Sequence, residues 1–317
     1  MLKKLKKKVL ISIAIGGLFY LAFTIYADYE SVVNAFSKFN WLLLPLLLFL
    51  SFLNYFTRFI KWDYYLSIVN IKLKKTDSLS IFMSGLIMSV TPGKVGELLK
   101  SYLVKEVTNE PISKTAPIIF AERITDFVSL LIMAIVGAYI FDYGGEITIG
   151  VAIFFLILIV IISNKRLALP IINMFEEINF LEKYMLSIQT GYASSYQLLK
   201  IKPLLMMTFV SLIAWGFECL GYYFILLNFH IDFGLIWASF SYSFATIIGA
   251  ISMLPGGLGV TEGSLTFMLI QENISKDVAV ATTFIVRVVT LWFAVLVGIV
   301  SVSFYQKRYG KLTIETD

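Results

Sequence analysis

The chain has 317 residues, of which 58% are hydrophobic and only 15% charged, and its mean hydropathy is +0.84. A soluble domain is typically about 45–50% apolar and about 25% charged, so this composition leaves too little polar surface for a water-soluble fold of this length. The net charge of only +5, with lysines gathered in short loops, argues against a nucleic-acid reader. One cysteine, Cys219, excludes a disulfide framework, and one histidine, His230, excludes a histidine metal cluster.

Eight apolar stretches follow one another along the chain. A helix that crosses a bilayer needs roughly 20 apolar residues, and six stretches approach that length without interruption: 9–27, 41–60, 116–140, 147–163, 203–228 and 278–304. Pro-Gly clusters interrupt the other two, 79–104 and 235–271. The sequence therefore predicts an all-α integral membrane protein with a single membrane domain over residues 1–317, built from six full transmembrane helices and two re-entrant broken hairpins.

The distribution of basic residues predicts the orientation in the membrane. Lysines and arginines accumulate in cytoplasmic loops, and here they gather on one side if the two interrupted stretches return to the side they entered from. Lys61 is counted with these inner loops, and the lysine-rich start is interpreted as a retained signal anchor. We therefore expect a protein of the plasma membrane with both termini cytoplasmic.

Two segments lie outside the apolar spans. Residues 164–202 carry apolar side chains at helical spacing, which predicts a cytoplasmic amphipathic helix that either lies in the membrane interface or packs on the bundle. Residues 306–317 form a polar tail.

The chain also contains an internal repeat. Both interrupted stretches carry Pro-Gly-x-apolar-Gly followed by Glu, within Met88–Glu97 and Ser252–Glu262. An arginine follows each motif at nearly equal spacing, inside the next apolar span. The unit of span, broken hairpin and arginine-bearing span therefore occurs twice, at about 41–140 and 203–304. Because three crossings separate equivalent points, the second unit is expected to be inverted, an arrangement that recurs in transporters.

The two Pro-Gly breaks are candidate anion sites. Proline fixes φ and glycine permits tight turns, and the amides freed at the start of the following half-helix attract anions. The alternative is a kink that only lets helices pack closely. The candidate substrate-binding residues are Gly93, Lys94, Gly96, Gly256 and Gly257, together with the intramembrane arginines Arg123 and Arg287.

Charged residues inside the spans need an explanation, since each costs roughly 2.5–3.5 kcal/mol to insert. Arg123 and Arg287 either bind an anionic headgroup through their planar forks or pair permanently with carboxylates as part of the scaffold. Glu218 is either a protonatable coupling site or a hydrogen-bonded core carboxyl. The candidate charge partners or coupling groups are Glu97, Glu122, Asp126, Glu218 and Glu262.

Three motifs, in this order, resemble the lysylphosphatidylglycerol synthase transmembrane family: Thr91–Glu97, Glu122–Asp126 and Leu254–Glu262. That family includes the flippase-like domain of the multiple peptide resistance factor and standalone membrane proteins. The resemblance implies movement of a lipid between leaflets, typically an aminoacylated phosphatidylglycerol, or a polyprenyl-phosphate lipid as in membrane regions attached to archaeal glycosyltransferases. The full resistance factor also has a soluble aminoacyltransferase domain, for which we see no room here, so lysyl transfer is not expected.

Three functions remain open at this point. The favoured one is a lipid flippase. The sequence contains no ATP motif, so transport would be either downhill or coupled to ions, with Glu97, Glu218 or Glu262 as candidate proton carriers. The second is a membrane-embedded headgroup transferase that uses Glu122 or Asp126, and the third is a non-catalytic partner of a separate soluble transferase. We expect a membrane phospholipid or polyprenyl lipid as partner, and no cofactor, metal or nucleic acid. Association of the chain with a second copy of itself stays open.

Overall fold

The computed structural model describes the backbone of residues 2–174 and 184–310. Within these ranges it describes all side chains except those of residues 2–10, 12, 13, 15, 94, 95 and 173. The predicted amphipathic segment and polar tail are therefore only partly covered, since residues 175–183 and 311–317 lie outside the described part.

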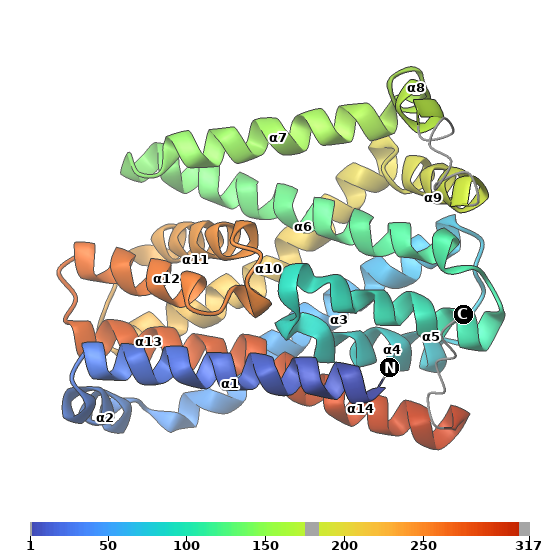
Figure 1. Cartoon of the computed structure of the whole chain (residues 1–317). Coiled ribbons are helices and arrows are strands. Elements are labelled where there is room, and N and C mark those ends of the chain that lie inside the picture. The colour runs from blue at the N-terminus through green and yellow to red at the C-terminus, as the bar shows by residue number, and fades with distance from the viewer. Residues whose placement is uncertain (1, 175–183, 311–317) are drawn as a thin grey trace.

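The described chain is built from helices, and no strand occurs in it (Figure 1). The long helices, in chain order, are α1 (Leu2–Tyr26), α2 (Tyr29–Lys38), α3 (Leu44–Ile68), α4 (Lys75–Gly85), α5 (Leu99–Thr108), α6 (Ile112–Phe141), α7 (Gly145–Ser163), α8 (Lys165–Met174), α9 (Met185–Leu198), α10 (Ile201–Asn228), α11 (Gly234–Ile251), α12 (Val260–Gln271), α13 (Lys276–Arg287) and α14 (Phe293–Tyr309). Short 3₁₀ turns are η1 (Trp41–Leu43), η2 (Leu86–Val90), η3 (Pro92–Leu98) and η5 (Pro255–Gly257), and a π-helical turn, η6 (Val288–Trp292), joins α13 to α14.

Six of the described helical segments are long and apolar enough to cross a bilayer: Trp41–Ile68, Ile112–Phe141, Gly145–Ser163, Ile201–Asn228, Gly234–Ile251 and Lys276–Tyr309. Five coincide with predicted spans. The predicted span 9–27 lies in α1 (Leu2–Tyr26), whose side chains are described only in part, and the sixth segment is α11 from the second interrupted stretch. The predicted all-α membrane fold is confirmed.

Each interrupted stretch folds as a helical hairpin with a break at its tip. In the first, α4 and α5 are joined by η2 and η3, and in the second, α11 and α12 are joined by η5. Proline opens each break, and Gly93 and Gly256 follow with φ of 56° and 61°, a left-handed conformation that favours glycine. The hairpins extend from opposite ends of the bundle (Figure 1), and their tips meet where Gly93 N donates a hydrogen bond to Met253 O at 3.3 Å.

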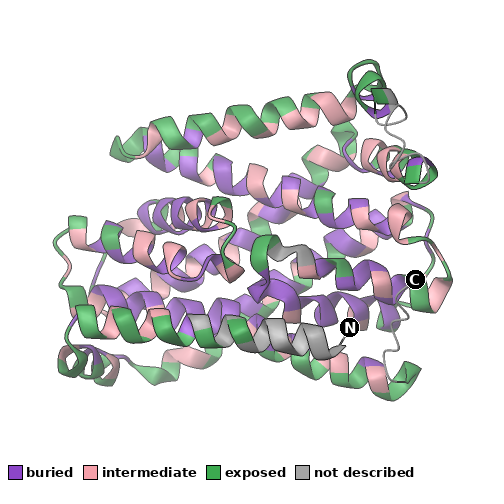
Figure 2. Cartoon of the chain, viewed as in Figure 1, coloured by how far each residue is buried: buried purple, intermediate pink, exposed green. Residues whose placement is uncertain are grey.

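The remaining long helices surround these hairpins. α3 packs on α10 at the centre, while α6 packs on α11 and α14 packs on α4. Figure 2 shows the buried residues concentrated on these inner helices, whereas α7 is exposed along most of its length. Large apolar side chains such as Ile153, Phe154 and Ile157 are more than half exposed on α7. Such a surface would promote aggregation in water but suits contact with lipid tails.

Two glycines allow the hairpins to approach the long helices closely. A Cβ added at Gly137 of α6 would lie 2.2 Å from the Cβ of Phe240 on α11, and one added at Gly298 of α14 would lie 2.2 Å from Ile87 N in η2. The contact at Gly298 is with backbone, which cannot rotate away as a side chain can. Each hairpin is thus held against a helix from the other half of the chain.

This packing yields a stability prediction. Gly298→Ala is expected to destabilise the protein by about 1–3 kcal/mol, because the methyl group overpacks a contact with backbone. Gly216→Ala on α10 is the matched control, since an added Cβ there meets nothing within 4 Å, and alanine favours a helix by up to about 1 kcal/mol. Thermal unfolding in detergent measures both. Equal unfolding temperatures for the two variants would contradict the proposed tight contact.

One expectation about a helix boundary was wrong. α3 does not end near residue 60 but continues to Ile68, so Lys61 is a helical residue and is completely buried rather than part of a loop. In the predicted amphipathic segment 164–202, the structure describes α8 and α9, on either side of residues 175–183. α9 packs against α6, which agrees with the alternative of a helix packed on the bundle.

Candidate functional site

Seven charged residues form a cluster in the interior of the protein, which we call the ion cluster. Its members come from four elements that the fold brings together, α3, η3, α5 and α6, and all are buried except Arg123, which is partly buried. They are Arg58, Lys61, Glu97, Lys100, Glu122, Arg123 and Asp126.

Asp126 is the central acceptor of the ion cluster. Its carboxylate lies 2.5 Å from Lys61 Nζ, 3.4 Å from an Arg58 nitrogen and 3.7 Å from an Arg123 nitrogen. Lys61 also donates hydrogen bonds to Ser211 Oγ at 2.7 Å and to Thr125 Oγ1 at 3.2 Å. An ammonium group that is fully removed from solvent requires such partners, because an unpaired buried charge is very costly.

The other half of the ion cluster ties the first hairpin to α6. Lys100 of α5 lies 2.5 Å from Glu122 and 3.9 Å from Glu97, and its ammonium group also stands 4.8 Å from the ring centre of Trp62. Glu97 accepts a hydrogen bond from Arg123 of α6. Since these contacts cross from the hairpin to a long helix, the ion cluster fixes the position of the first break.

A second, smaller charge pair holds the second hairpin. Arg287 of α13 donates through Nε to Glu262 at 2.8 Å and through its terminal nitrogen to Gly256 O at 2.5 Å. Glu262 also accepts from Gly259 N at 2.8 Å, and Tyr20 of α1 donates to it at 3.5 Å. One guanidinium group therefore joins the tip of the hairpin to the helix that follows it.

Glu218 of α10 is a further buried carboxyl of this region. Tyr242 of α11 donates a hydrogen bond to Glu218 Oε2 at 2.6 Å, and the carboxyl is 8% exposed. Both residues line the cavity described next.

A cavity of about 770 Å³ connects these groups. Its charged wall contains three arginines and two carboxylates, and the hairpin tips contribute backbone. The rest of the lining, the apolar wall, comes mainly from α6, α7 and the tip of the second hairpin. The charged lining residues are Arg58, Arg123, Asp126, Glu218 and Arg287, and the apolar ones include Phe127, Phe154, Phe155, Leu158 and Met253. Phe154 and Met253 are each 61% exposed, so the apolar wall continues onto the outer surface.

The predicted glycines lie at the hairpin tips, but their amides are largely used within the chain. Gly93, Gly256 and Gly257 line the cavity. The amide of Gly96 instead donates a hydrogen bond to Thr91 Oγ1 at 3.1 Å, so it is already used within the chain. At the second break, the Glu262 carboxylate accepts a hydrogen bond from the amide of Gly259, the residue before α12. The backbone of Lys94 lies in η3, and its side chain lies outside the described residues.

Arg123 and Arg287 both pair with carboxylates in the structure. This is what the interpretation of these arginines as part of the scaffold predicts. A role in binding stays a prediction, as it does for the five predicted acidic residues. Arg58, Lys61, Lys100 and Tyr242 were missed. The signal was present for two of them: Arg58 is a charge inside the apolar stretch 41–60, and Lys61 follows at i+3, on the same helix face.

The described residues contain no group of three or more His, Cys, Asp or Glu side chains placed to hold a metal ion. The chemistry of the cavity is that of a charged and hydrogen-bonding surface next to an apolar one. This combination suits an amphiphilic molecule with a polar headgroup and a long apolar chain.

Comparison with known proteins agrees with this description. The family model for the lysylphosphatidylglycerol synthase TM region matches residues 9–298. A UPF0104 membrane protein of Methanocaldococcus jannaschii is 29% identical over 225 residues, which cover 69% of this chain and 93% of the relative. Another, from Methanothermobacter thermautotrophicus, is 24% identical and covers 95% of this chain and 96% of its own length. The chain is therefore an integral membrane protein that belongs to the lysylphosphatidylglycerol synthase transmembrane family.

Proposed function

We propose that this protein moves an anionic or aminoacylated phospholipid, or a polyprenyl-phosphate lipid, between the two leaflets of the cell membrane. The observation that carries the proposal is the cavity, which joins buried arginines to an apolar wall that reaches the lipid-facing surface. A headgroup in such a cavity would meet the charged wall while its chains stay beside α7.

The electrostatics of the cavity support a phosphate-bearing headgroup. Arg58 Nε and Arg123 Nε are buried donors without a hydrogen-bond partner among the described residues, and a buried donor left unpaired costs about 1–3 kcal/mol. Arginine binds phosphate oxygens with good geometry. A phosphate placed between these guanidinium groups would satisfy donors that the carboxylates leave unused.

We also propose that the two hairpins are re-entrant and belong to inverted repeat units. The pairing of helices supports this: α6 packs on the second hairpin through Gly137, and α14 packs on the first through Gly298, so equivalent helices make equivalent contacts. In a transporter of this kind, alternating access arises when one repeat rocks against the other around a fixed site. The contact between Gly93 and Met253 would then be where the halves part.

Reconstitution into liposomes tests the proposal. Purified protein is expected to move fluorescent phosphatidylglycerol or a polyprenyl-phosphate analogue to the other leaflet faster than in empty liposomes, as read by quenching of outer-leaflet probes. Phosphatidylcholine is the comparison lipid. No movement above empty liposomes for any of these lipids would refute the proposal.

Filling the cavity should stop this movement. Gly150 of α7 lines the cavity, and an added Cβ there meets nothing within 4 Å, so Gly150→Trp is expected to reduce flipping about tenfold without unfolding the protein. Gly145→Trp is the matched control, because Gly145 is on the same helix with equally open surroundings and does not line the cavity. Equal rates in both variants would show that lipid does not use this cavity.

A further inference from the structure

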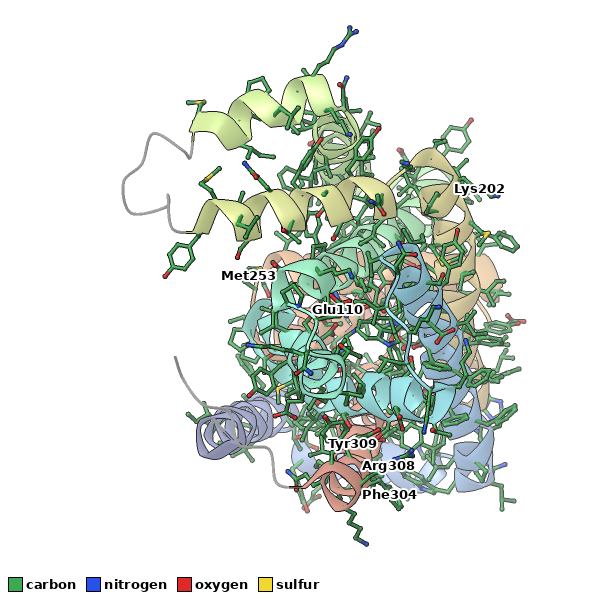
Figure 3. All side chains as sticks on the ribbon, turned by 90° about the vertical axis from the view of Figure 1, so that its right-hand side faces the viewer. Glu110, Lys202, Met253, Phe304, Arg308 and Tyr309 are labelled. Carbon is green, nitrogen blue, oxygen red and sulfur yellow. The ribbon has the colours of Figure 1, made fainter. Side chains whose placement is uncertain are left out.

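A second pocket, far from the hairpin tips in the fold, lies between α8 and α9. It has a volume of about 410 Å³, and residues from both helices and from the residue that precedes α10 line it. α8 and α9 lie side by side at the end of the bundle where α7 ends (Figures 1 and 3). Its lining includes Lys165, Tyr192, Tyr196 and Lys200.

Two positive charges converge on one aromatic ring in this pocket. Lys165 Nζ lies 4.8 Å and Lys200 Nζ 5.5 Å from the centre of the Tyr196 ring. No carboxylate is among the residues that line the pocket in the described part of the chain. Like charges that lie near the same ring repel each other, and an anion bound in the pocket would offset that repulsion.

The pocket also offers a hydrogen-bond donor. Tyr192 lines it, and the buried Tyr192 hydroxyl has no hydrogen-bond partner among the described residues. Tyr192 and Tyr196 stand 6.3 Å apart by ring centres. The pocket therefore combines two ammonium groups, a phenolic donor and the flat faces of two tyrosine rings. This combination suits the binding of a phosphate ester.

The position of the lysines identifies the source of that phosphate. Lys165 follows the candidate span Gly145–Ser163 almost directly, and Lys200 immediately precedes the span Ile201–Asn228. Basic residues at the ends of spans lie at the level of the lipid headgroups, and basic pockets between helices there bind anionic headgroups. A soluble phosphate compound would gain nothing from that placement.

We propose that the pocket between α8 and α9 binds the headgroup of an anionic phospholipid, at a site separate from the central cavity. The lipid bound here is a resident of one leaflet rather than a transported molecule, because the residues of this pocket share no member with the lining of the central cavity. It would hold α8 and α9 against the membrane beside α6.

Photo-cross-linking of the full chain tests this site. The protein is placed in vesicles of nine parts phosphatidylcholine to one part phosphatidylglycerol that contain a trace of photoreactive phosphatidylglycerol, and labelled peptides are mapped by mass spectrometry. Labelling of residues 185–200 is expected to fall about tenfold in Lys165→Gln/Lys200→Gln, given the typical contribution of a basic residue near an anionic surface. A photoreactive phosphatidylcholine probe is expected to give no such change.

The control variant removes the same charge from the same end of the protein. Arg166→Gln/Lys202→Gln neutralises two exposed residues that do not line the pocket, of which Lys202 is labelled in Figure 3. It is expected to change labelling less than twofold. Equal loss in both double variants would show general surface attraction, and loss of labelling on addition of excess inorganic phosphate would show that the pocket recognises soluble phosphate; either result overturns the proposal. Failure here leaves the flipping assay unaffected, since the two sites are distinct.

Discussion

Asp126→Asn is expected to destabilise the protein by about 3–5 kcal/mol, the typical cost of breaking a buried ion pair by removing one partner. The amide cannot neutralise Lys61, whose side chain is 0% exposed and lies 2.5 Å from the carboxylate in the intact protein. It also leaves Arg58, at 3.4 Å, with a weaker acceptor. Because proteins are typically stable by only about 5–15 kcal/mol, we expect a sharp drop in the yield of monodisperse protein and in its unfolding temperature.

Two further variants separate this effect from a general response to mutation. Lys61→Met/Asp126→Asn removes the ammonium group together with its partner, and replacing a buried pair by uncharged groups is often neutral or stabilising. The loss that is due to Lys61 should therefore return, whereas Arg58 still lacks its carboxylate. Asp63→Asn, on the same helix as Lys61, breaks an ion pair with Lys75, whose side chain is 77% exposed. Such a surface pair contributes at most about 1 kcal/mol. An Asp126→Asn protein as stable as Asp63→Asn would show that the ion cluster does not hold the fold.

The overall architecture was predictable because it depends on features that are local in sequence. Uninterrupted apolar length predicts a spanning helix, and proline followed by glycine predicts a break. These signals located five of the six candidate spans and both hairpin tips. They could not locate the end of α3, since Lys61 looks like a loop residue until its buried partners on α6 and α10 are known.

The composition of the candidate site was harder to predict, because it depends on which helices meet. Arg123 and Arg287 stand out as charges in apolar spans, and Glu97 and Glu262 follow the breaks at similar positions. Nothing in the order of residues indicates that α3 supplies two cations to Asp126, or that Lys100 of the hairpin reaches Glu122. Those contacts bring together residues 22 to 68 positions apart in the chain.

The charge pair of the second hairpin, Arg287 and Glu262, changes how the proposed anion binding would work. The sequence suggests free backbone amides at each break, whereas in the folded protein the Glu262 carboxylate already occupies the amide of Gly259. An incoming phosphate at this break would therefore have to displace a carboxylate of the protein rather than enter an empty cradle. Exchange of Glu262 for substrate phosphate at Arg287 would couple headgroup binding to movement of the hairpin tip.

Arg287→Lys tests that coupling directly. Lysine keeps the positive charge beside Glu262 but, as a compact ammonium group, cannot reproduce the arginine fork that reaches both Glu262 and Gly256 O. We expect flipping in liposomes to fall about tenfold, because the hairpin tip is no longer held. Stability should fall by only about 1.5–3 kcal/mol, the value of one hydrogen bond from a charged group.

Arg308→Lys is the matched control for Arg287→Lys. Arg308 lies further along the same continuous helical segment and pairs with Asp77 at 3.1 Å, but its side chain is 51% exposed, so its replacement should leave both flipping and stability nearly unchanged. Unfolding temperature and flipping rate are measured on the same preparations. If Arg287→Lys flips lipid as fast as Arg308→Lys, then Arg287 acts only through its charge, and the bond to Gly256 plays no part in transport.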